Sequence, residues 1–228
     1  MSLDPSRVTT VTFDSYGTLV DVTAATNALA DRVPEPEPVS RLWRSRSLEY
    51  TFVANQIDGY VAFYDILRDA LQYALAANDV QLPADEREEI LAVYHELDVF
   101  EDVRDGIERL HDAGIPTYVL SNGDPEMLRS MVAHADIGDL VVDCISADEV
   151  ETFKPDPTLY RHAAARTGTH IEDMLHVTAG WFDVFGAVHA GMQAAWVDRQ
   201  GVPWEPFGPS PDLETESLTA VADALTGD

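Results

Sequence analysis

The sequence predicts an α/β protein with a parallel sheet as its core and an additional all-helical segment. Over residues 101–198, short apolar stretches alternate with longer stretches of helical periodicity, and one more apolar stretch opens the chain. Residues 39–95 show helical periodicity only. Strands that alternate with helices imply a parallel sheet with crossover helices on both faces. The 228 residues suffice for one such core and a smaller accessory domain.

The first predicted strand covers residues 8–13, where β-branched residues surround the apolar Val11 and Phe13. The pattern breaks at Gly17, which indicates a loop. Asp14 therefore stands at the carboxyl end of a buried strand, and this is the end at which parallel sheets bind ligands.

The helical segment follows a run of alternating proline and glutamate, residues 34–38, which we predict to be a non-helical spacer. From residue 39 to about residue 95 we expect roughly three helices and no strand. One of them is amphipathic, with apolar residues at spacings of three and four: Phe63, Leu67, Leu71, Ala74 and Leu75. We therefore predict a core domain of residues 1–20 and 101–228 and a helical cap domain of residues 21–100.

The core is predicted to continue as alternating helices and strands: helices at 103–114, 125–135, 156–168 and 184–191, and strands at 116–121, 141–146, 173–179 and 193–198. Residues 202–211, rich in proline and glycine, are expected to run over the surface. Polar residues follow two of the strands: Ser121 with Asn122, and Asp183. These side chains should meet Asp14 at one edge of the sheet.

The chain carries 41 acidic and 14 basic residues, a formal net charge of −27 that is spread along its length. This charge disfavours nucleic-acid binding. It would also repel an anionic substrate at long range unless concentrated salt shortens the Debye length to a few ångströms. We therefore predict the salt-rich cytoplasm of a halophilic organism. We expect no membrane contact, because no apolar stretch approaches the roughly 18 residues of a membrane span and the first residues do not form a signal peptide.

Thirteen of the basic residues are arginines, and Lys154 is the only lysine. A lysine retained in such a chain indicates a site that needs a compact cation. Near Asp14, Gly17 permits a tight turn and Thr18 can donate a hydrogen bond to a carboxylate, while Ser121 supplies a second hydroxyl. The sequence therefore predicts an anion-handling site. The seven histidines show no spacing of a metal site, and we interpret them as surface or hydrogen-bonded core residues.

Four motifs resemble, in order and spacing, those of the haloacid dehalogenase (HAD) superfamily: FDSYGTL at 13–19, LSNG at 120–123, KPDP at 154–157 and the acidic residue 183. Residues 42–51 and 60–63 resemble the helical cap of the type II L-2-haloacid dehalogenases. The resemblance covers nearly the whole chain. It implies the HAD fold, a Rossmann-like parallel sheet core with an inserted α-helical cap.

Tyr16 separates two branches of this superfamily. Its phosphatases carry aspartate two positions after the nucleophile, because an alkoxide leaving group must be protonated by a general acid, whereas halide needs no proton. With Tyr16 at this position, the chain resembles the dehalogenases. The resemblance implies hydrolysis of a small (S)-2-haloacid to a 2-hydroxy acid and halide through an Asp14 ester, without a cofactor.

The resemblance also implies roles for individual residues. Asp14 is the nucleophile and Thr18 orients it. Lys154 keeps Asp14 and Asp183 ionised, since a nearby cation lowers the pKa of a carboxylate. Asp183 orients the hydrolytic water. Tyr160 closes the site beside Lys154.

The substrate-binding positions follow in the same way. Ser121 and the amides after Asp14, beginning at Ser15, would hold the substrate carboxylate. A guanidinium, an amide and an aromatic edge suit a large soft anion, and the halide cradle would be Arg44, Asn122 and Phe63. Three further residues would form the apolar wall: Tyr16, Leu48 and Phe182.

The chain departs from the family at residues 178–183. Where the family usually has SSNAWD, this chain has TAGWFD. Thr178 keeps a catalytic hydroxyl, but Gly180 replaces an asparagine. This change is expected to slow ester hydrolysis or to mark a different substrate.

Three further functions remain open from the sequence. The first is that of a phosphatase or phosphonatase that binds Mg²⁺ through Asp14, a backbone carbonyl and Asp183. The second is that of a related hydrolase that opens a small cyclic amino acid by the same attack on carbon. The third is that of an inactive binding protein that retains the HAD fold. The resemblance is also compatible with a homodimer.

Overall fold

The computed structural model describes residues 2–227 and contains a six-stranded, fully parallel sheet in the order β3-β2-β1-β4-β5-β6. The strands are β1 (Thr10–Phe13), β2 (Thr117–Ser121), β3 (Asp143–Ser146), β4 (Met174–Thr178), β5 (Gln193–Val197) and β6 (Leu213–Thr215). All four residues of β1 are buried, as expected for a central strand. The α/β parallel fold predicted from the sequence is confirmed.

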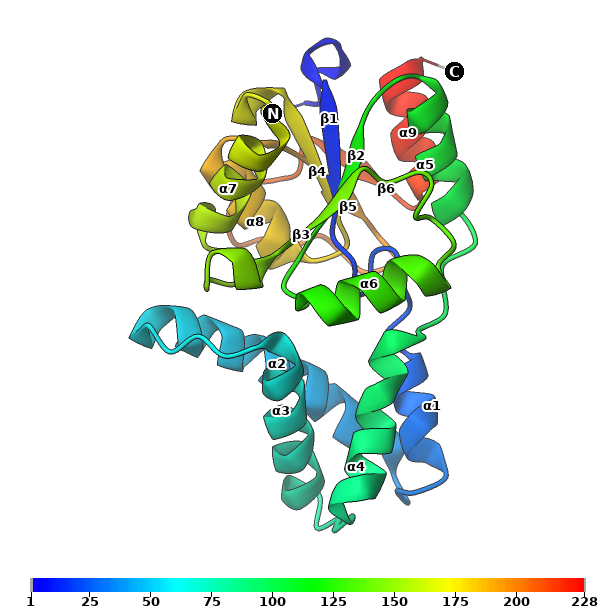
Figure 1. The fold of residues 1–228 in the computed structure, drawn as a ribbon, viewed down its shortest axis with the longest axis vertical. Helices are drawn as coiled ribbons and strands as arrows, with labels where there is room; N and C mark the ends of the chain where they lie inside the picture. The colour runs from blue at the N-terminus through cyan, green and yellow to red at the C-terminus, as the bar shows by residue number, and fades with distance from the viewer. Residues whose placement is uncertain (1, 228) are drawn as a thin grey trace.

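Helices cover both faces of the sheet (Figure 1). Helices α7 (Pro157–Thr167) and α8 (Trp181–Ala190) pack together on one side, and α5 (Val103–Asp112) packs against α9 (Leu218–Thr226) on the other. Helix α6 (Pro125–His134) follows β2. Short 3₁₀ turns lie at Pro5–Arg7, Ala147–Glu149 and Ile171–Asp173.

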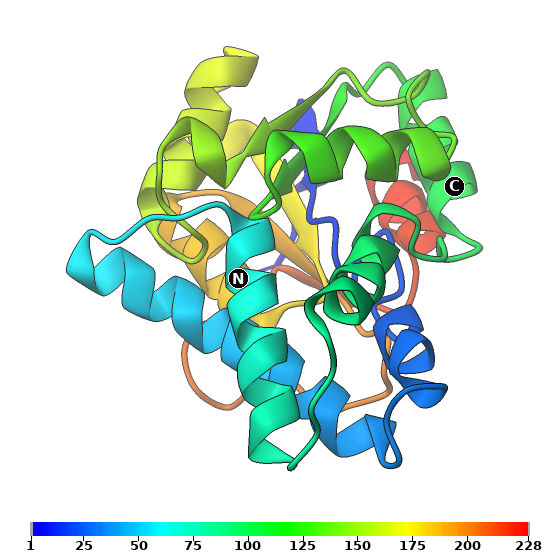
Figure 2. The ribbon, with the colours of Figure 1, turned by 60° about the horizontal axis from the view of Figure 1, so that its bottom comes forward.

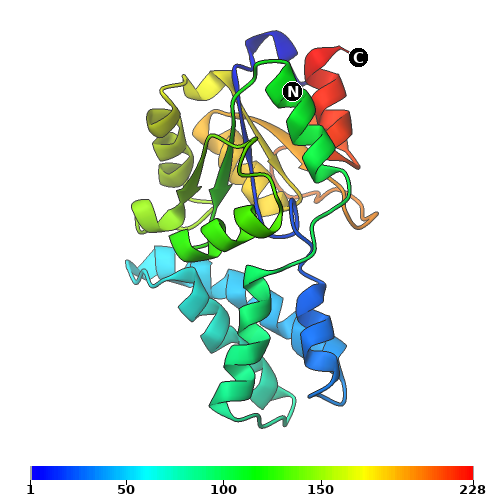
Figure 3. The same ribbon diagram turned by 45° about the vertical axis from the view of Figure 1, so that its right-hand side comes forward.

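The remaining helices gather beyond the end of the sheet towards which β1 runs (Figures 1 and 3). They are α1 (Ala24–Ala30), α2 (Pro36–Ile57), α3 (Phe63–Ala77) and α4 (Ala84–Leu91), which continues as a 3₁₀ turn, Ala92–His95. Residues 39–95 therefore hold three α-helices and no strand, as predicted. Helix α1 was not expected.

The predicted spacer at residues 34–38 is wrong in its second half. Helix α2 begins at Pro36, and Pro38 also lies in its first turn. Proline is tolerated there because the first backbone N–H groups of a helix have no partner within the helix.

The helices beyond the sheet bury apolar side chains that are continuous with the core around the sheet. Helices α2 and α3 cross (Figure 2), and the predicted apolar residues of α3 face inward. Trp43 of α2 is fully buried, and its Nε1–H donates to the carbonyl oxygen of Leu67 at 2.8 Å. The indole thus joins the two helices by packing and by a hydrogen bond.

Two adjacent segments connect the cap helices to the sheet. Val20 and Val99 form an antiparallel bridge. The N–H of Asp21 donates to the carbonyl of Asp98 at 2.7 Å, and the N–H of Phe100 donates to the carbonyl of Leu19 at 3.1 Å. The chain leaves and re-enters the core at one place, which is compatible with the proposed domain limits near residues 20 and 100.

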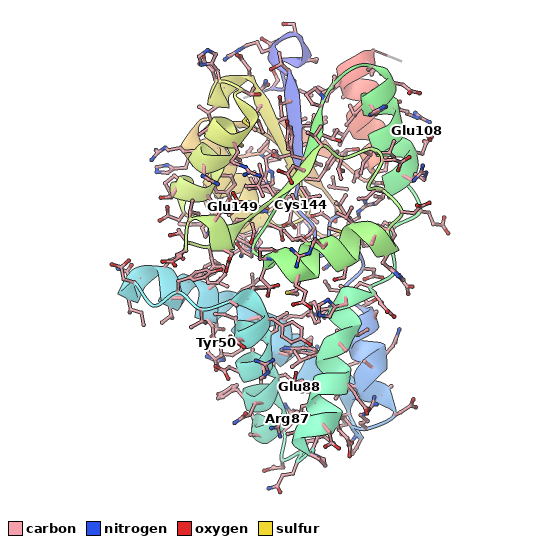
Figure 4. All side chains as sticks on the ribbon, viewed as in Figure 1. Tyr50, Arg87, Glu88, Glu108, Cys144 and Glu149 are labelled. Atoms are coloured by element: carbon pink, nitrogen blue, oxygen red, sulfur yellow. The ribbon has the colours of Figure 1, made fainter. Side chains whose placement is uncertain are left out.

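The end of the chain returns to the core. Residues 202–210 form a largely exposed loop, as expected, but β6 then extends the sheet beside β5 and α9 covers α5. Neither element was predicted. Exposed acidic side chains are distributed over separate elements, for example Glu88 on α4, Glu108 on α5 and Glu149 after β3 (Figure 4). Among residues 2–227, no helix is both long and apolar enough to span a membrane.

Gly106 allows α5 and α9 to approach closely. A Cβ atom at residue 106 would lie 2.7 Å from Cβ and 2.8 Å from the carbonyl carbon of Leu218. We expect Gly106→Ala to lower the free energy of unfolding by about 1–2 kcal/mol, because overpacking outweighs the gain in helix propensity. Urea denaturation measures this. Gly138→Ala is the control, since its Cβ would lie 3.5 Å from the nearest atom, Val132 Cγ1. Equal stabilities of the two variants would contradict the prediction.

Candidate active site

Asp14 directly follows β1 at the centre of the sheet. Its N–H donates to the carbonyl of Val177 in β4 at 3.0 Å, which fixes the backbone at this point. One carboxylate oxygen, Oδ2, accepts a hydrogen bond from Thr18 Oγ1 at 3.0 Å, and Oδ1 accepts one from Lys154 Nζ at 2.9 Å. The side chain is 17% exposed and is therefore accessible from a cavity.

A tight turn after β1 brings Thr18 back to Asp14. Gly17 adopts a φ of +84°, a left-handed conformation that favours glycine, and its N–H donates to the carbonyl of Val20 at 2.8 Å. Thr18 Oγ1 also accepts the N–H of Ala179 at 2.9 Å. Thr18 thus connects the loops after β1 and β4.

Lys154 joins Asp14 to Asp183. Its Nζ lies 2.7 Å from Asp183 Oδ2, and both side chains are buried. Burial alone would lower the pKa of Lys154, but Asp14 and Asp183 outweigh it and raise that pKa above its usual value. Burial acts to raise the pKa of Asp183, but His176 and Lys154 hold it well below its usual range. Both shifts favour the charged forms of Lys154 and Asp183.

Two more side chains contact Asp183. The hydroxyl of Tyr160 donates to Asp183 Oδ1 at 2.6 Å, and His176 Nε2 lies 2.9 Å from Asp183 Oδ2. Burial first, and then the neighbouring Asp183, keep the pKa of Tyr160 well above its usual value, so the hydroxyl stays a donor.

His176 was not predicted from the sequence to be a site residue. The available signal was a single histidine inside the apolar strand MLHVT, all of whose residues are buried. Such a histidine must find hydrogen-bond partners inside the protein.

The predicted carboxylate-binding and halide-binding residues form two groups. Ser121 Oγ lies 2.6 Å from Ser15 Oγ and accepts the N–H of Gly123 at 3.0 Å. Asn122 Oδ1 accepts the backbone N–H of Lys154 at 2.8 Å. These three residues are buried and do not line the cavity in front of Asp14: Ser15, Ser121 and Asn122. Their binding roles stay predictions.

The other group lines a cavity of about 230 Å³ in front of Asp14. Its walls include the predicted Tyr16, Arg44, Leu48, Phe63 and Phe182, together with Tyr94, Leu67, Ala179, Gly180 and Gln200. Asp14 is the one carboxylate and Arg44 the one cation among the described residues that line it. No hydrogen bond or ion pair joins the Arg44 guanidinium to another residue within 2–227, so it is available to an anion.

Gly180 lies in this wall, at the start of α8. A Cβ atom at residue 180 would lie 3.2 Å from Phe182 Cε1, so glycine leaves room for the phenyl ring. The N–H of Gly180 donates to Thr178 Oγ1 at 3.0 Å. The hydroxyl of Thr178 therefore shapes the loop, and Gly180 itself contributes no side chain.

The geometry does not favour a metal at Asp183. Its Oδ1 accepts from Tyr160, and its Oδ2 accepts from Lys154 and contacts His176, so both oxygens already have donors. Within the described residues, no three His, Cys, Asp or Glu side chains are grouped so that they could hold a metal ion.

Comparisons with known proteins agree with the motifs. The family model of the haloacid dehalogenase-like hydrolases matches residues 8–191. (S)-2-haloacid dehalogenase 2 of Pseudomonas sp. (strain CBS-3) is 34% identical over 216 residues, 94% of each chain. (S)-2-haloacid dehalogenase 4A of Burkholderia cepacia is 33% identical over 194 residues, 85% of this chain and 84% of its own.

Among solved structures, the L-2-haloacid dehalogenase of Xanthobacter autotrophicus with chloropropionic acid covalently bound superposes with a TM-score of 0.90. It is 27% identical, and the match covers 96% of this chain and 99% of that chain. The matches to the relatives and to this structure extend over most of the chain and are not limited to a single motif. The chain therefore belongs to the family of haloacid dehalogenase-like hydrolases, as its four motifs predicted.

Proposed function

We propose that the protein hydrolyses a small (S)-2-haloacid to the 2-hydroxy acid and halide, with Asp14 as nucleophile. One observation carries this proposal: Asp14 opens into a largely apolar cavity whose one described cation, Arg44, makes no hydrogen bond or ion pair with the described residues. This arrangement suits attack on carbon with departure of an anion that needs no proton. The similarity to named (S)-2-haloacid dehalogenases supports the same reaction.

In the first step, a carboxylate oxygen of Asp14 attacks C2 of the substrate. The new C–O bond forms as the carbon–halogen bond breaks, and the halide leaves with the bonding electrons towards Arg44. Thr18 and Lys154 each hold one carboxylate oxygen, so the attacking group is oriented before substrate binds.

In the second step, water attacks the carbonyl carbon of the Asp14 ester. The bond between that carbon and the ester oxygen breaks, the 2-hydroxy acid leaves, and Asp14 is regenerated with net release of one proton. Asp183 accepts hydrogen bonds from three side chains, and its pKa is lowered, so it is a weak base. These properties suit a carboxylate that orients water through Lys154.

The cavity disfavours a phosphatase. The pKa values of Tyr16 and Tyr94, the cavity tyrosines, are raised above their usual value by burial, so neither is a ready general acid. Asp183, which a phosphatase would need as a magnesium ligand, already has a hydrogen-bond donor at each carboxylate oxygen. We propose a reaction without a metal cofactor.

Two other functions fit the site less well than haloacid hydrolysis does: ring opening of a cyclic amino acid, and binding without catalysis. A cyclic amino acid carries an ammonium group, but the described cavity wall offers no carboxylate except the nucleophile. An inactive protein would not need Asp14, Lys154 and Asp183 to be joined by hydrogen bonds of 2.9 and 2.7 Å.

The cellular setting and assembly remain proposals. The net charge of −27 supports a salt-rich cytoplasm, and it makes nucleic acid an unsuitable partner. A homodimer stays a prediction that light scattering in concentrated KCl can test.

We expect bromide release from (S)-2-bromopropionate in concentrated KCl, unaffected by EDTA, and its loss in Asp14→Asn. A single turnover in ¹⁸O-labelled water should place the label in the Asp14 carboxylate, because water attacks the aspartyl carbonyl. Mass spectrometry of the peptide containing Asp14 measures this. Mg²⁺-dependent release of phosphate from p-nitrophenyl phosphate, with no bromide release from either enantiomer, would instead establish the phosphatase.

We expect Arg44→Lys to lower kcat/KM for the haloacid by roughly 10- to 100-fold, since a charged hydrogen bond contributes about 1.5–3 kcal/mol. Steady-state kinetics measures this. Arg46→Lys is the matched control on the same helix, because Arg46 pairs with Glu49 and stacks on Tyr73 outside the cavity. An equal loss in both variants would argue against a role of Arg44 in anion binding.

Lys154→Met should abolish halide release and lower the free energy of unfolding by about 3–5 kcal/mol, because it leaves Asp183 as a buried charge without its cation. Thermal and urea denaturation measure the stability. Arg129→Met, at an exposed position of α6, should change it by less than about 0.5 kcal/mol. A stable, active Lys154→Met protein would refute the proposed ion triad.

A further inference from the structure

His176 is fully buried at the centre of β4. It lies opposite Thr12 of β1 in the parallel register, and its Nδ1 is 2.8 Å from Thr12 Oγ1. Its Nε2 is 2.9 Å from Asp183 Oδ2, and the ring packs edge-on against Tyr160 at a centroid distance of 5.7 Å. Both ring nitrogens thus have partners, and the ring has one defined orientation.

The hydrogen-bond roles follow from the partners. The Asp183 carboxylate is ionised and only accepts, so His176 Nε2 carries a proton. Thr12 Oγ1 can donate to Nδ1 of a neutral ring or accept from Nδ1 of a charged one, so the hydroxyl is a partner of the ring in either form. Lys154 Nζ lies 3.4 Å from the same Nε2, but both groups are donors and both are directed at Asp183 Oδ2.

Asp183 is therefore held by three donors, one from each of β4, α7 and the loop before α7. Tyr160 binds Oδ1, while His176 and Lys154 share Oδ2. Without the imidazole, Oδ2 would have Lys154 as its only described donor, and the carboxylate would be held by Tyr160 and the flexible lysine alone. Because the ammonium ends a flexible four-carbon chain, its position against Asp14 depends on where Asp183 holds it.

We propose that His176, fixed by Thr12, is a positioning residue that holds Asp183 so that Lys154 stays against Asp14. The proposal rests on the proposed function for its catalytic effect. His176 does not line the described cavity, so it acts through Asp183 and Lys154 and does not touch substrate.

Packing alone does not account for this pair. An apolar side chain at residue 176 of β4 would fill the same space without burying polar groups. An imidazole and a hydroxyl buried together carry a desolvation cost that only their hydrogen bonds offset. Thr12 and His176 form a chain of hydrogen bonds that ends at the carboxylate of Asp183.

The only lysine of the chain makes the proposal directly measurable. Protein grown with lysine labelled with ¹⁵N at Nζ gives one side-chain resonance, that of Lys154. In the wild type we expect a resonance with slowly exchanging protons, because Nζ is buried and bonded to two carboxylates. His176→Phe should shift it and accelerate exchange, and His176→Gln, which keeps an amide donor near the position of Nε2, should restore it.

Kinetics supplies the second measurement. On the haloacid that the wild type hydrolyses, His176→Phe should lower kcat by roughly 10- to 100-fold, as expected for loss of a hydrogen bond to a charged group, with KM little changed. Thr12→Val should lower kcat less. It should cause no further loss in the His176→Phe background, because both changes break one chain of hydrogen bonds.

Thr117→Val is the matched control. Thr117 is a buried strand threonine whose hydroxyl donates to the carbonyl of Leu140 at 3.0 Å, on the strand next to β1. This variant should lose stability while it keeps both kcat and the Lys154 resonance. It separates the loss of stability on removal of any buried hydroxyl from a displacement of Lys154 between Asp14 and Asp183.

An unchanged resonance and kcat in folded His176→Phe protein would overturn the proposal. So would an equal kcat loss in His176→Gln, or an additive loss in the Thr12→Val double variant. If the wild type releases no halide but the Lys154 resonance responds as described, the positioning role stands and the proposed function alone fails. The two failures are therefore distinguishable.

Discussion

A buried ammonium, that of Lys154, is shared by two carboxylates that come from distant parts of the chain. Asp14 is 140 residues away in sequence, and Asp183 is 29 residues away on the other side. Burying a charged pair such as Lys154 and Asp183 is costly unless both groups are paired and hydrogen-bonded. The ends of β1 and β4, the loop before α7 and the start of α8 are therefore constrained to one arrangement.

The site divides into a layer that faces the cavity and a layer that supports it. The facing layer is largely apolar, with Asp14 and Arg44 as its described charges. The supporting layer is polar and densely hydrogen-bonded, with Thr18, Lys154 and Asp183 at its centre. This division places the carboxylate of Asp14 in a cavity of low polarity, where its electrostatic interactions are strong.

The electrostatic interactions of the acidic surface and those of the site act over different distances. Concentrated salt screens the exposed carboxylates within a few ångströms, whereas the buried ion triad is screened much less. An anionic substrate would then meet the local field of Arg44 at the cavity and not the net charge of the whole molecule. The same salt that lowers repulsion at the surface leaves the preorganised pairs around Asp14 intact.

The sequence by itself determined the alternation of strands and helices, the all-helical segment and the position of Asp14 after β1, because apolar periodicity and turn residues act locally. Its motifs also predicted that Lys154 and Asp183 are site residues. The tertiary structure decided that Pro36 starts a helix and that β6 and α9 complete the core. It also decided that His176 of β4 reaches Asp183, since that contact depends on strand register and on the path of α8, which local periodicity does not encode.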